Sequence, residues 1–333
     1  MTKDLGFGVG AGLVSALLFG MLLKATPLAI VLYLLAPLPI LIVGLGWSHR
    51  AALAAVVAGS VALTLLVSPY LAFAFAAYLA VPAWWLAYLA LLGRPVPDGG
   101  LEWYPLGRLL AWVAGTAALA FVAIAVIASP DYETFHSQIS AMSRKVIQVQ
   151  TQGRPGAPAP APTTPSEPGQ GSAPADDAQA PDTPSEVADA LASIAPALAA
   201  QGLTLLLAFY LWAAARIVQV SGRLPRPWPD IPATAMPRQV LGVLAAGIAL
   251  SFAGGYPGVL GVALTGALTA VFALQGLAAF HDRSRGRPGR GLMLFAMYMV
   301  LFVTQGIALI ALTLFGLADT ALDRRRPKGP VAP

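Results

Sequence analysis

Long stretches without a single charged side chain constrain the fold of this sequence more than any other feature. A transmembrane helix needs about 20 predominantly apolar residues to cross the hydrocarbon core of a bilayer. The chain is 57% apolar and 11% charged, whereas soluble domains carry about 25% charged residues. The sequence therefore predicts a multi-pass membrane protein. Its uncharged stretches are Leu5–Leu23, Ala25–Trp47, Ala51–Leu92, Leu109–Ala128, Ala197–Ala215, Val240–Phe280 and Gly291–Ala318.

Two of these stretches have the length of two helices, and both contain a signal for a break. Proline disfavours helix at the residue before it, which predicts that a helix ends near Ser68-Pro69. The run Gly254-Gly255-Tyr256-Pro257 predicts a turn within the other stretch. The expected fold class is therefore all-α: a polytopic transmembrane helical bundle of eight or nine spans.

The positions of arginine and lysine predict the orientation, because cytoplasmic loops of membrane proteins carry an excess of both. Nine spans would place the basic residues Arg324–Arg326 and Lys328 outside, against this rule, so one apolar segment is expected to be re-entrant or the tail breaks the rule. Ala25–Trp47, which contains Pro27, Pro37 and Pro39, is the segment expected to be irregular. With a cytoplasmic N-terminus, the inside loops contain Arg50, Arg94, Arg108, Arg223, Arg226, Arg238, Arg283, Arg285, Arg287 and Arg290.

The middle of the chain has a different composition. Residues 129–196 contain eight acids and three bases, a net charge of −5, which suits the non-cytoplasmic side. Within this insert, residues 153–184 are rich in Pro and Ala and lack large apolar side chains, which predicts a disordered linker. Apolar residues at helical spacing predict amphipathic helices on both of its flanks. The expected domains are an N-terminal bundle (1–128), the insert (129–196), a C-terminal bundle (197–318) and a basic tail (319–333).

The charged residues lie outside the apolar stretches, which disfavours ion-coupled transport, since ionisable groups inside spans mark ion and proton pathways. There is no cysteine, and His49, His136 and His281 have no second ligand at a metal-binding spacing. No nucleophile motif or pair of carboxylates in apolar surroundings occurs. We therefore expect no enzyme activity, no cofactor, no metal and no nucleic-acid partner.

The first span carries a small residue at every fourth position: Gly8, Gly12, Ala16 and Gly20. Small side chains let helix backbones approach closely in lipid, where van der Waals contact drives association. This stripe predicts helix packing, either within the bundle of this chain or against a partner subunit.

Polar residues near the end of the C-terminal spans suggest a polar pocket. Gln275 and Asp282 are seven positions apart, and Gln305 and Asp319 are fourteen apart, so each pair shares a helix face. Together with His281 these residues form the candidate pocket. The alternative interpretation is that each buried amide bonds to a neighbouring helix.

Several short runs resemble the YybS-like family of bacterial membrane proteins of unknown function. They are Gln275–His281, Leu314–Asp319 with Arg324–Arg326, Ala36–Trp47 and Pro237-Arg238. That family resembles the substrate-binding S components of energy-coupling-factor vitamin transporters, and more distantly the rod-shape protein MreD. In S components a small-residue first helix docks onto the coupling subunit, which is the pattern of Gly8, Gly12, Ala16 and Gly20. The longer chain and the acidic insert depart from S components, and no ligand motif carries over.

The sequence and the resemblance lead to two main functional hypotheses for a multi-pass protein of the bacterial inner membrane, and to a third, a lipid-handling protein whose substrate enters sideways between the two bundles. The first is a non-enzymatic scaffold in envelope processes that contacts the lipid bilayer and other membrane proteins. The alternative is a substrate-binding subunit of an ATP-driven uptake transporter for a small metabolite or vitamin, powered by partner ATPases because the chain has no P-loop of its own.

Overall fold

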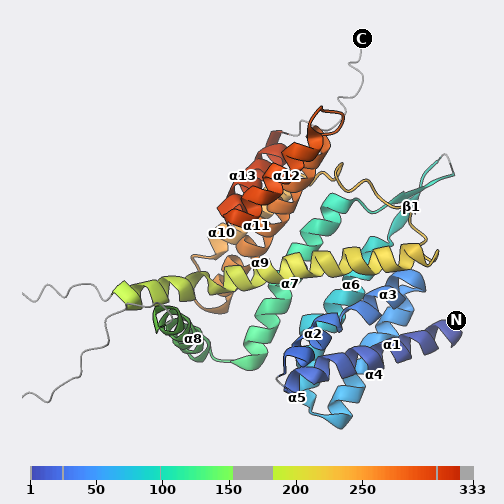
Figure 1. The fold of residues 1–333 in the computed structure, drawn as a ribbon. Coiled ribbons are helices and arrows are strands. Elements are labelled where there is room, and N and C mark those ends of the chain that lie inside the picture. Colours follow the sequence, from blue (N-terminus) through green and yellow to red (C-terminus); the bar gives the residue numbers. More distant parts are fainter. Residues whose placement is uncertain (1, 25, 98, 153–182, 305–306, 323–333) are drawn as a thin grey trace, which may run out of the picture. The chain divides into compact units, whose positions relative to one another are not determined.

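The computed structural model describes residues 2–24, 26–97, 99–152, 183–304 and 307–322, and most of these residues lie in helices (Figure 1). The first part of the chain contains α1 (Thr2–Gly20), η1 (Met21–Lys24), α2 (Pro27–Leu35), α3 (Leu38–Gly46), α4 (His49–Leu66), α5 (Pro69–Phe75), the π-helical turn η2 (Ala76–Ala80), α6 (Val81–Ala90) and α7 (Leu106–Ala128). Strands β1 (Gly93–Pro95) and β2 (Leu101–Trp103) form an antiparallel hairpin between α6 and α7. The remaining helices are α8 (Tyr132–Gln152), α9 (Thr183–Val220), α10 (Gln239–Leu250), α11 (Gly255–Arg283), α12 (Arg290–Val303) and α13 (Ile307–Leu322).

Within the described residues, seven helical segments are long and apolar enough to cross a membrane, and three further apolar helices are shorter. The three are α10, α12 and α13, with 12, 14 and 16 residues. At 1.5 Å per residue they reach about 18 to 24 Å, less than the thickness of a hydrocarbon core. The chain is thus a multi-pass helical membrane protein, and the expected count of eight or nine full spans is not confirmed.

Both predicted breaks are confirmed, and local side chains explain them. α4 ends at Leu66, and α5 begins at Pro69, where the hydroxyl of Ser68 accepts a hydrogen bond of 3.1 Å from the N–H of Leu71. Serine caps the helix while proline, which lacks an N–H, fits its first position. At the second break α10 ends at Leu250, and α11 begins at Gly255, whose φ of +69° suits glycine.

The expectation that Gly291–Ala318 is one unbroken span is wrong, because the structure divides it into α12 and α13. Thr304 ends α12. Its hydroxyl donates to the carbonyl of Val300 (2.7 Å) and accepts from the N–H of Ala308 (3.2 Å). A threonine that bonds to the backbone on both sides competes with helix continuation. Gln305 lies outside the described residues.

The irregularity expected in Ala25–Trp47 occurs at the junction of α2 and α3, beside Pro37. There the buried hydroxyl of Ser15, on α1, donates to the carbonyl of Ala36 at 2.5 Å. Backbone groups freed by a proline in the membrane need such a partner, since lipid offers none. These two helices together still form one candidate span, Pro27–Gly46.

The chain divides into two compact units: residues 1–128 with 196–333, and Ser129–Ala195. The second unit contains α8 and the start of α9, so the helices expected on both flanks of the linker are present. Its buried residues include Ser140, Ser143 and Ala188, whereas Met142 and Val149 on the expected apolar stripe are exposed. The predicted linker, residues 153–184, lies almost wholly outside the described residues.

In the first unit, two apolar clusters share helices α7 and α9. One cluster gathers side chains from α1 to α7, and α9 contributes Leu207 and Val218. The other gathers α10 and α11, with Ala114 and Ala118 of α7 and Ala200 of α9. Since both clusters use the same two helices, the membrane bundle of this unit is continuous from one half of the chain to the other.

Helices α11 and α13 run parallel to each other. The hydroxyl of Thr313 donates to the carbonyl of Thr269 (3.1 Å), and further along both helices the amide of Gln275 donates to Asp319 (2.9 Å). The C-terminal ends of the two helices therefore lie together, beside Arg283.

Candidate functional site

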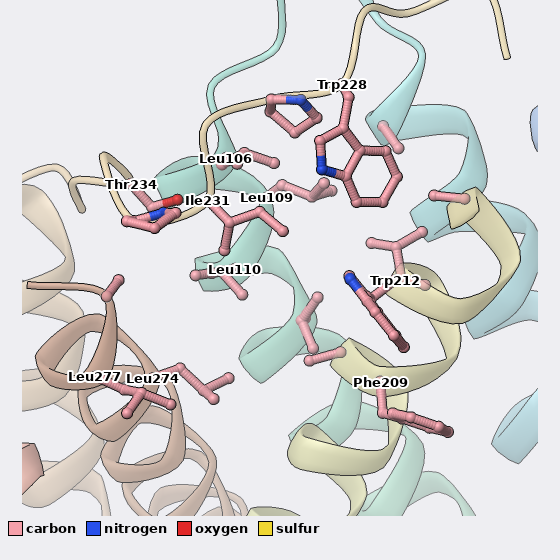
Figure 2. A pocket seen from close by; sticks show the side chains of 18 of the residues that line it. Leu106, Leu109, Leu110, Phe209, Trp212, Trp228, Ile231, Thr234, Leu274 and Leu277 are labelled. Carbon is pink, nitrogen blue, oxygen red and sulfur yellow. The ribbon is translucent and has the colours of Figure 1, made fainter. Parts of the chain in front are cut away.

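A cavity of about 510 Å³ opens between α7, α9 and α11 in the first unit. Figure 2 shows the side chains that surround it: Leu106, Leu109 and Leu110 from α7, Phe209 and Trp212 from α9, Leu274 and Leu277 from α11, and Trp228, Ile231 and Thr234 from the segment between α9 and α10. Ligand pockets of proteins have volumes of about 300–1,000 Å³. The cavity is thus large enough for one small molecule.

Apolar side chains provide nearly all of the lining. The polar side chains on it are Arg226, Thr234, His281 and Tyr298, together with the indole N–H groups of its tryptophans. Ligand pockets commonly combine mostly apolar walls with a few polar groups that fix the orientation of the ligand. This cavity has that composition, and its lining contains no carboxylate among the described residues.

The segment 221–238 between α9 and α10, here called the strap, forms one wall of the cavity. Cation–π contacts attach it to helices: the guanidinium of Arg223 lies 4.5 Å from the ring centre of Trp47, and that of Arg216 lies 5.4 Å from Trp228. At its end Met236 is buried, and a Cβ on Gly107 would overlap the backbone there. These contacts hold the strap over the cavity.

A salt bridge fixes the middle of the strap to the turn after α11. Both terminal guanidinium nitrogens of Arg285 donate to the carboxylate of Asp230, one of them at 2.7 Å. Hydrogen bonding from Arg285 lowers the pKa of Asp230, and the bonds to Asp230 raise the pKa of Arg285. Both side chains are exposed, so the pair positions the strap and adds little stability.

Arg226 has the most unusual environment on the strap. It is half-buried, lines the cavity, and donates a hydrogen bond of 3.0 Å to the carbonyl of Ala90 at the end of α6. Burial lowers its pKa. Among the described residues no carboxylate forms an ion pair with it, in contrast to Arg283 and Arg285.

The structure brings Gln275 and Asp319 together, and neither residue lines the cavity. The amide of Gln275 donates to one carboxylate oxygen of Asp319 at 2.9 Å, and Arg283 binds the other at 3.0 Å. Asp319 is 6% exposed and Gln275 is fully buried. Arg283 also lies 4.9 Å from the ring centre of Phe315. This cluster links α11 to α13.

The other residues of the expected polar pocket lie elsewhere. His281 lines the cavity, where its Nδ1 bonds to the carbonyl of Leu277 (3.0 Å) and its Nε2 to the hydroxyl of Tyr298 (3.3 Å). Asp282 lies 3.8 Å from Arg285. The four described residues of the expected pocket therefore fall into three separate groups of contacts, with only Gln275 and Asp319 together, and Gln305 is outside the described residues. No group of His, Asp and Glu that could hold a metal occurs in the part of the chain that the structure describes.

The small residues of the first span face α4 of the same chain. A Cβ on Gly8 would overlap the backbone of Ala51, and a Cβ on Gly12 would overlap that of Ala55. Ala16 is buried, and Gly20 lies farther from α4, since a Cβ on it would be 4.0 Å from the side chain of Leu63. α1 and α4 are thus in parallel contact through small residues, which is the geometry that permits close approach in lipid.

Sequence reasoning missed the cavity. Its walls come from segments as far apart in the chain as Leu45 of α3 and Tyr298 of α12, and their leucines look like ordinary lipid-facing residues. Arg226 stands out in the sequence only for its positive charge. A usable signal was present in the strap, where tryptophan and arginine alternate with proline in Arg223–Pro232.

Residues 13–320 match the family model described as a predicted membrane protein, DUF2232. No curated protein and no solved structure matches the chain. The family match covers both halves of the membrane bundle, including every helix that lines the cavity. The chain therefore belongs to the DUF2232 family of predicted membrane proteins.

Proposed function

We propose that this protein is a non-enzymatic binding protein that holds a small molecule with an apolar body in the cavity between α7, α9 and α11. The cavity itself carries this proposal. Helices in a membrane gain stability from van der Waals contact, so a gap of about 510 Å³ between them forgoes that gain. A ligand in the cavity restores the missing contacts. The walls suit a hydrophobic molecule, and the polar groups at the strap suit a more polar end.

The role that fits best is capture of the ligand for a partner that supplies energy. The chain has no phosphate-binding loop, so release or transport of the ligand needs other subunits. This proposal keeps the alternative suggested by the resemblance to S components, but it replaces a water-soluble vitamin by a lipophilic ligand.

A scaffold role is the second proposal, and α12 favours it. None of its residues is buried, and side chains such as Leu292, Phe295 and Phe302 are exposed. Another membrane protein or lipid must cover them. The small-residue face of α1 supports this role less, because Gly8 and Gly12 contact α4.

We further propose that the strap and the N-terminus face the cytoplasm of a bacterial inner membrane. The strap and the turn between α11 and α12 carry Arg223, Arg226, Arg285 and Arg287. Positive charge of this density is typical of cytoplasmic loops. The cavity then opens near the inner surface of the membrane.

Photolabelling tests the binding function. The full-length protein, purified into lipid nanodiscs, is irradiated with hexadecanol that carries a diazirine in its chain. Leu277→Trp fills the cavity and is expected to reduce labelling of α7, α9 and α11 at least fivefold. Leu292→Trp is the matched control: Leu292 is 73% exposed and does not line the cavity. Equal labelling of the wild type and Leu277→Trp would reject the cavity as a binding site.

A further inference from the structure

Within the part of the chain that the structure describes, the cavity carries a positive charge without an acidic partner. Arg226 lines it, and neither the lining nor any ion pair in the described residues provides a carboxylate for this guanidinium. Its one hydrogen bond to a described residue goes to the carbonyl of Ala90, a neutral acceptor. A guanidinium has five N–H donors, so most of its donors remain for another group.

Three other arginines near this end of the bundle have partners. Arg283 binds Asp319, Arg285 binds Asp230, and Arg223 lies over the ring of Trp47. Arg226 is also the arginine on the cavity wall. The three partnered arginines therefore stabilise the fold, whereas Arg226 remains able to bind a ligand.

Removing a cation from water is costly unless a counter-charge and hydrogen bonds compensate it. An anionic group compensates best, because guanidinium forms paired, charge-assisted hydrogen bonds with carboxylate and phosphate. A neutral hydroxyl would satisfy one donor and leave the charge uncompensated. The apolar walls, by contrast, select a hydrocarbon body.

Building on the proposed binding function, we infer that the ligand is an anionic amphiphile: its charged head binds Arg226 under the strap, and its hydrocarbon chain occupies the cavity between α7, α9 and α11. The head is a carboxylate or a phosphate. A free fatty acid and a phospholipid of the bilayer both offer this chemistry.

Competition against the diazirine-hexadecanol label measures the preference for charge. The competitors are palmitate and unlabelled hexadecanol, which have the same chain and differ at the head. In the wild-type protein palmitate is expected to displace the label at a concentration about tenfold lower than hexadecanol. In Arg226→Gln, palmitate is expected to displace the label only at the concentration that hexadecanol requires. Arg226→Lys keeps the charge and is expected to retain part of the preference for palmitate.

Arg287→Gln is the matched control, because Arg287 is an exposed arginine of the turn after α11 and does not line the cavity. It is expected to leave the tenfold preference unchanged. A monodisperse elution profile for each variant shows that it folds. Loss of the preference in Arg287→Gln as well would overturn the assignment of Arg226, since an arginine outside the cavity would then have the same effect.

The outcomes separate this inference from the proposed function. If palmitate and hexadecanol compete equally and both lose their effect in Leu277→Trp, the cavity binds ligand but the anionic head is wrong. If neither displaces the label from the wild type, the binding function itself is wrong. Repeating the competition in nanodiscs with and without phosphatidylglycerol identifies the source: a preference for phosphatidylglycerol over palmitate supports a bilayer lipid, and the reverse supports a free fatty acid.

Discussion

Helix α11 meets its neighbours in two contrasting ways. Toward α13 it presents Gly276, and a Cβ there would overlap the backbone of Leu312, so the two helices are in close contact. Toward the cavity it presents Leu274 and Leu277, which face α7 and α9 across a gap (Figure 2). The two faces thus come from four consecutive residues: Leu274 and Leu277 line the cavity, and Gln275 and Gly276 contact α13.

The contrast shows how side-chain size controls space inside a membrane protein. Glycine and alanine let backbones approach and leave no room between helices. Leucine and tryptophan hold the backbones apart, and where their side chains do not interlock a cavity remains. The Gln275–Asp319–Arg283 cluster strengthens the closed side with polar bonds, whereas the open side keeps Arg226 without an acidic partner among the described residues.

The largest expected effect compares two leucines of α11. Leu268 is 1% exposed within a packed cluster, so Leu268→Ala is expected to cost about 2–5 kcal/mol of unfolding free energy. Leu277→Ala removes the same atoms from a wall that already borders a gap, and its cost is expected to be well under half as large. Unfolding in mixed detergent micelles measures both. Equal losses of unfolding free energy would mean that side chains of the protein itself fill the cavity in the purified protein.

Substitutions at two glycines test the close contact between α11 and α13. Gly276→Ala introduces a Cβ that overlaps the backbone of Leu312 and is expected to destabilise by about 1–3 kcal/mol. Gly242→Ala, in the exposed interior of α10, has open space around its Cβ. That substitution is expected to stabilise by about 0.5–1 kcal/mol, because alanine favours helix over glycine. The two changes thus have opposite signs, and equal signs would contradict the close contact of α11 and α13.

The next largest effect on the unfolding free energy is expected from the buried carboxylate of Asp319. Asp319→Asn keeps the shape of the side chain but leaves Arg283 without its ionic partner, for an expected loss of about 1–3 kcal/mol. Glu102→Gln breaks a pair with Arg94 of similar length, 2.7 Å, on the exposed hairpin. Exposed pairs contribute little, so this control is expected to stay within about 0.5 kcal/mol of the wild type.

The smallest effect is a pH dependence at the strap. The pKa of Asp230 lies below its ordinary value of 3.8 because Arg285 bonds to its charged form. The pair therefore stabilises the folded strap above the ordinary pKa, and this contribution is lost as pH falls through the lowered pKa. The melting temperature of Asp230→Asn is expected to lie slightly below that of the wild type at neutral pH, and the difference to vanish in strong acid. A difference that grows in acid would contradict this sign.

Local rules allowed part of the fold to be predicted from the sequence. The apolar stretches and the breaks at Ser68-Pro69 and Gly254–Pro257 depend on neighbouring residues, and the structure has them. The division at Thr304 was missed because it rests on one hydroxyl that bonds backbone groups four residues away on each side.

The candidate site was harder to predict, because its contacts join distant segments. Spacing along a helix grouped Gln275 with Asp282, and Gln305 with Asp319. In the structure Gln275 bonds across to Asp319 on a parallel helix. No periodicity reveals which leucines of α7, α9 and α11 face a gap rather than lipid, since both surroundings select the same side chains.

The most direct test of this account is a cryo-electron microscopy map of the full-length protein in nanodiscs with palmitate added. The account predicts elongated density in the cavity, beside Leu109 and Leu277, with its head at Arg226. A cavity closed by inward movement of the strap, with lipid density only on the outer surfaces of the helices, would contradict it.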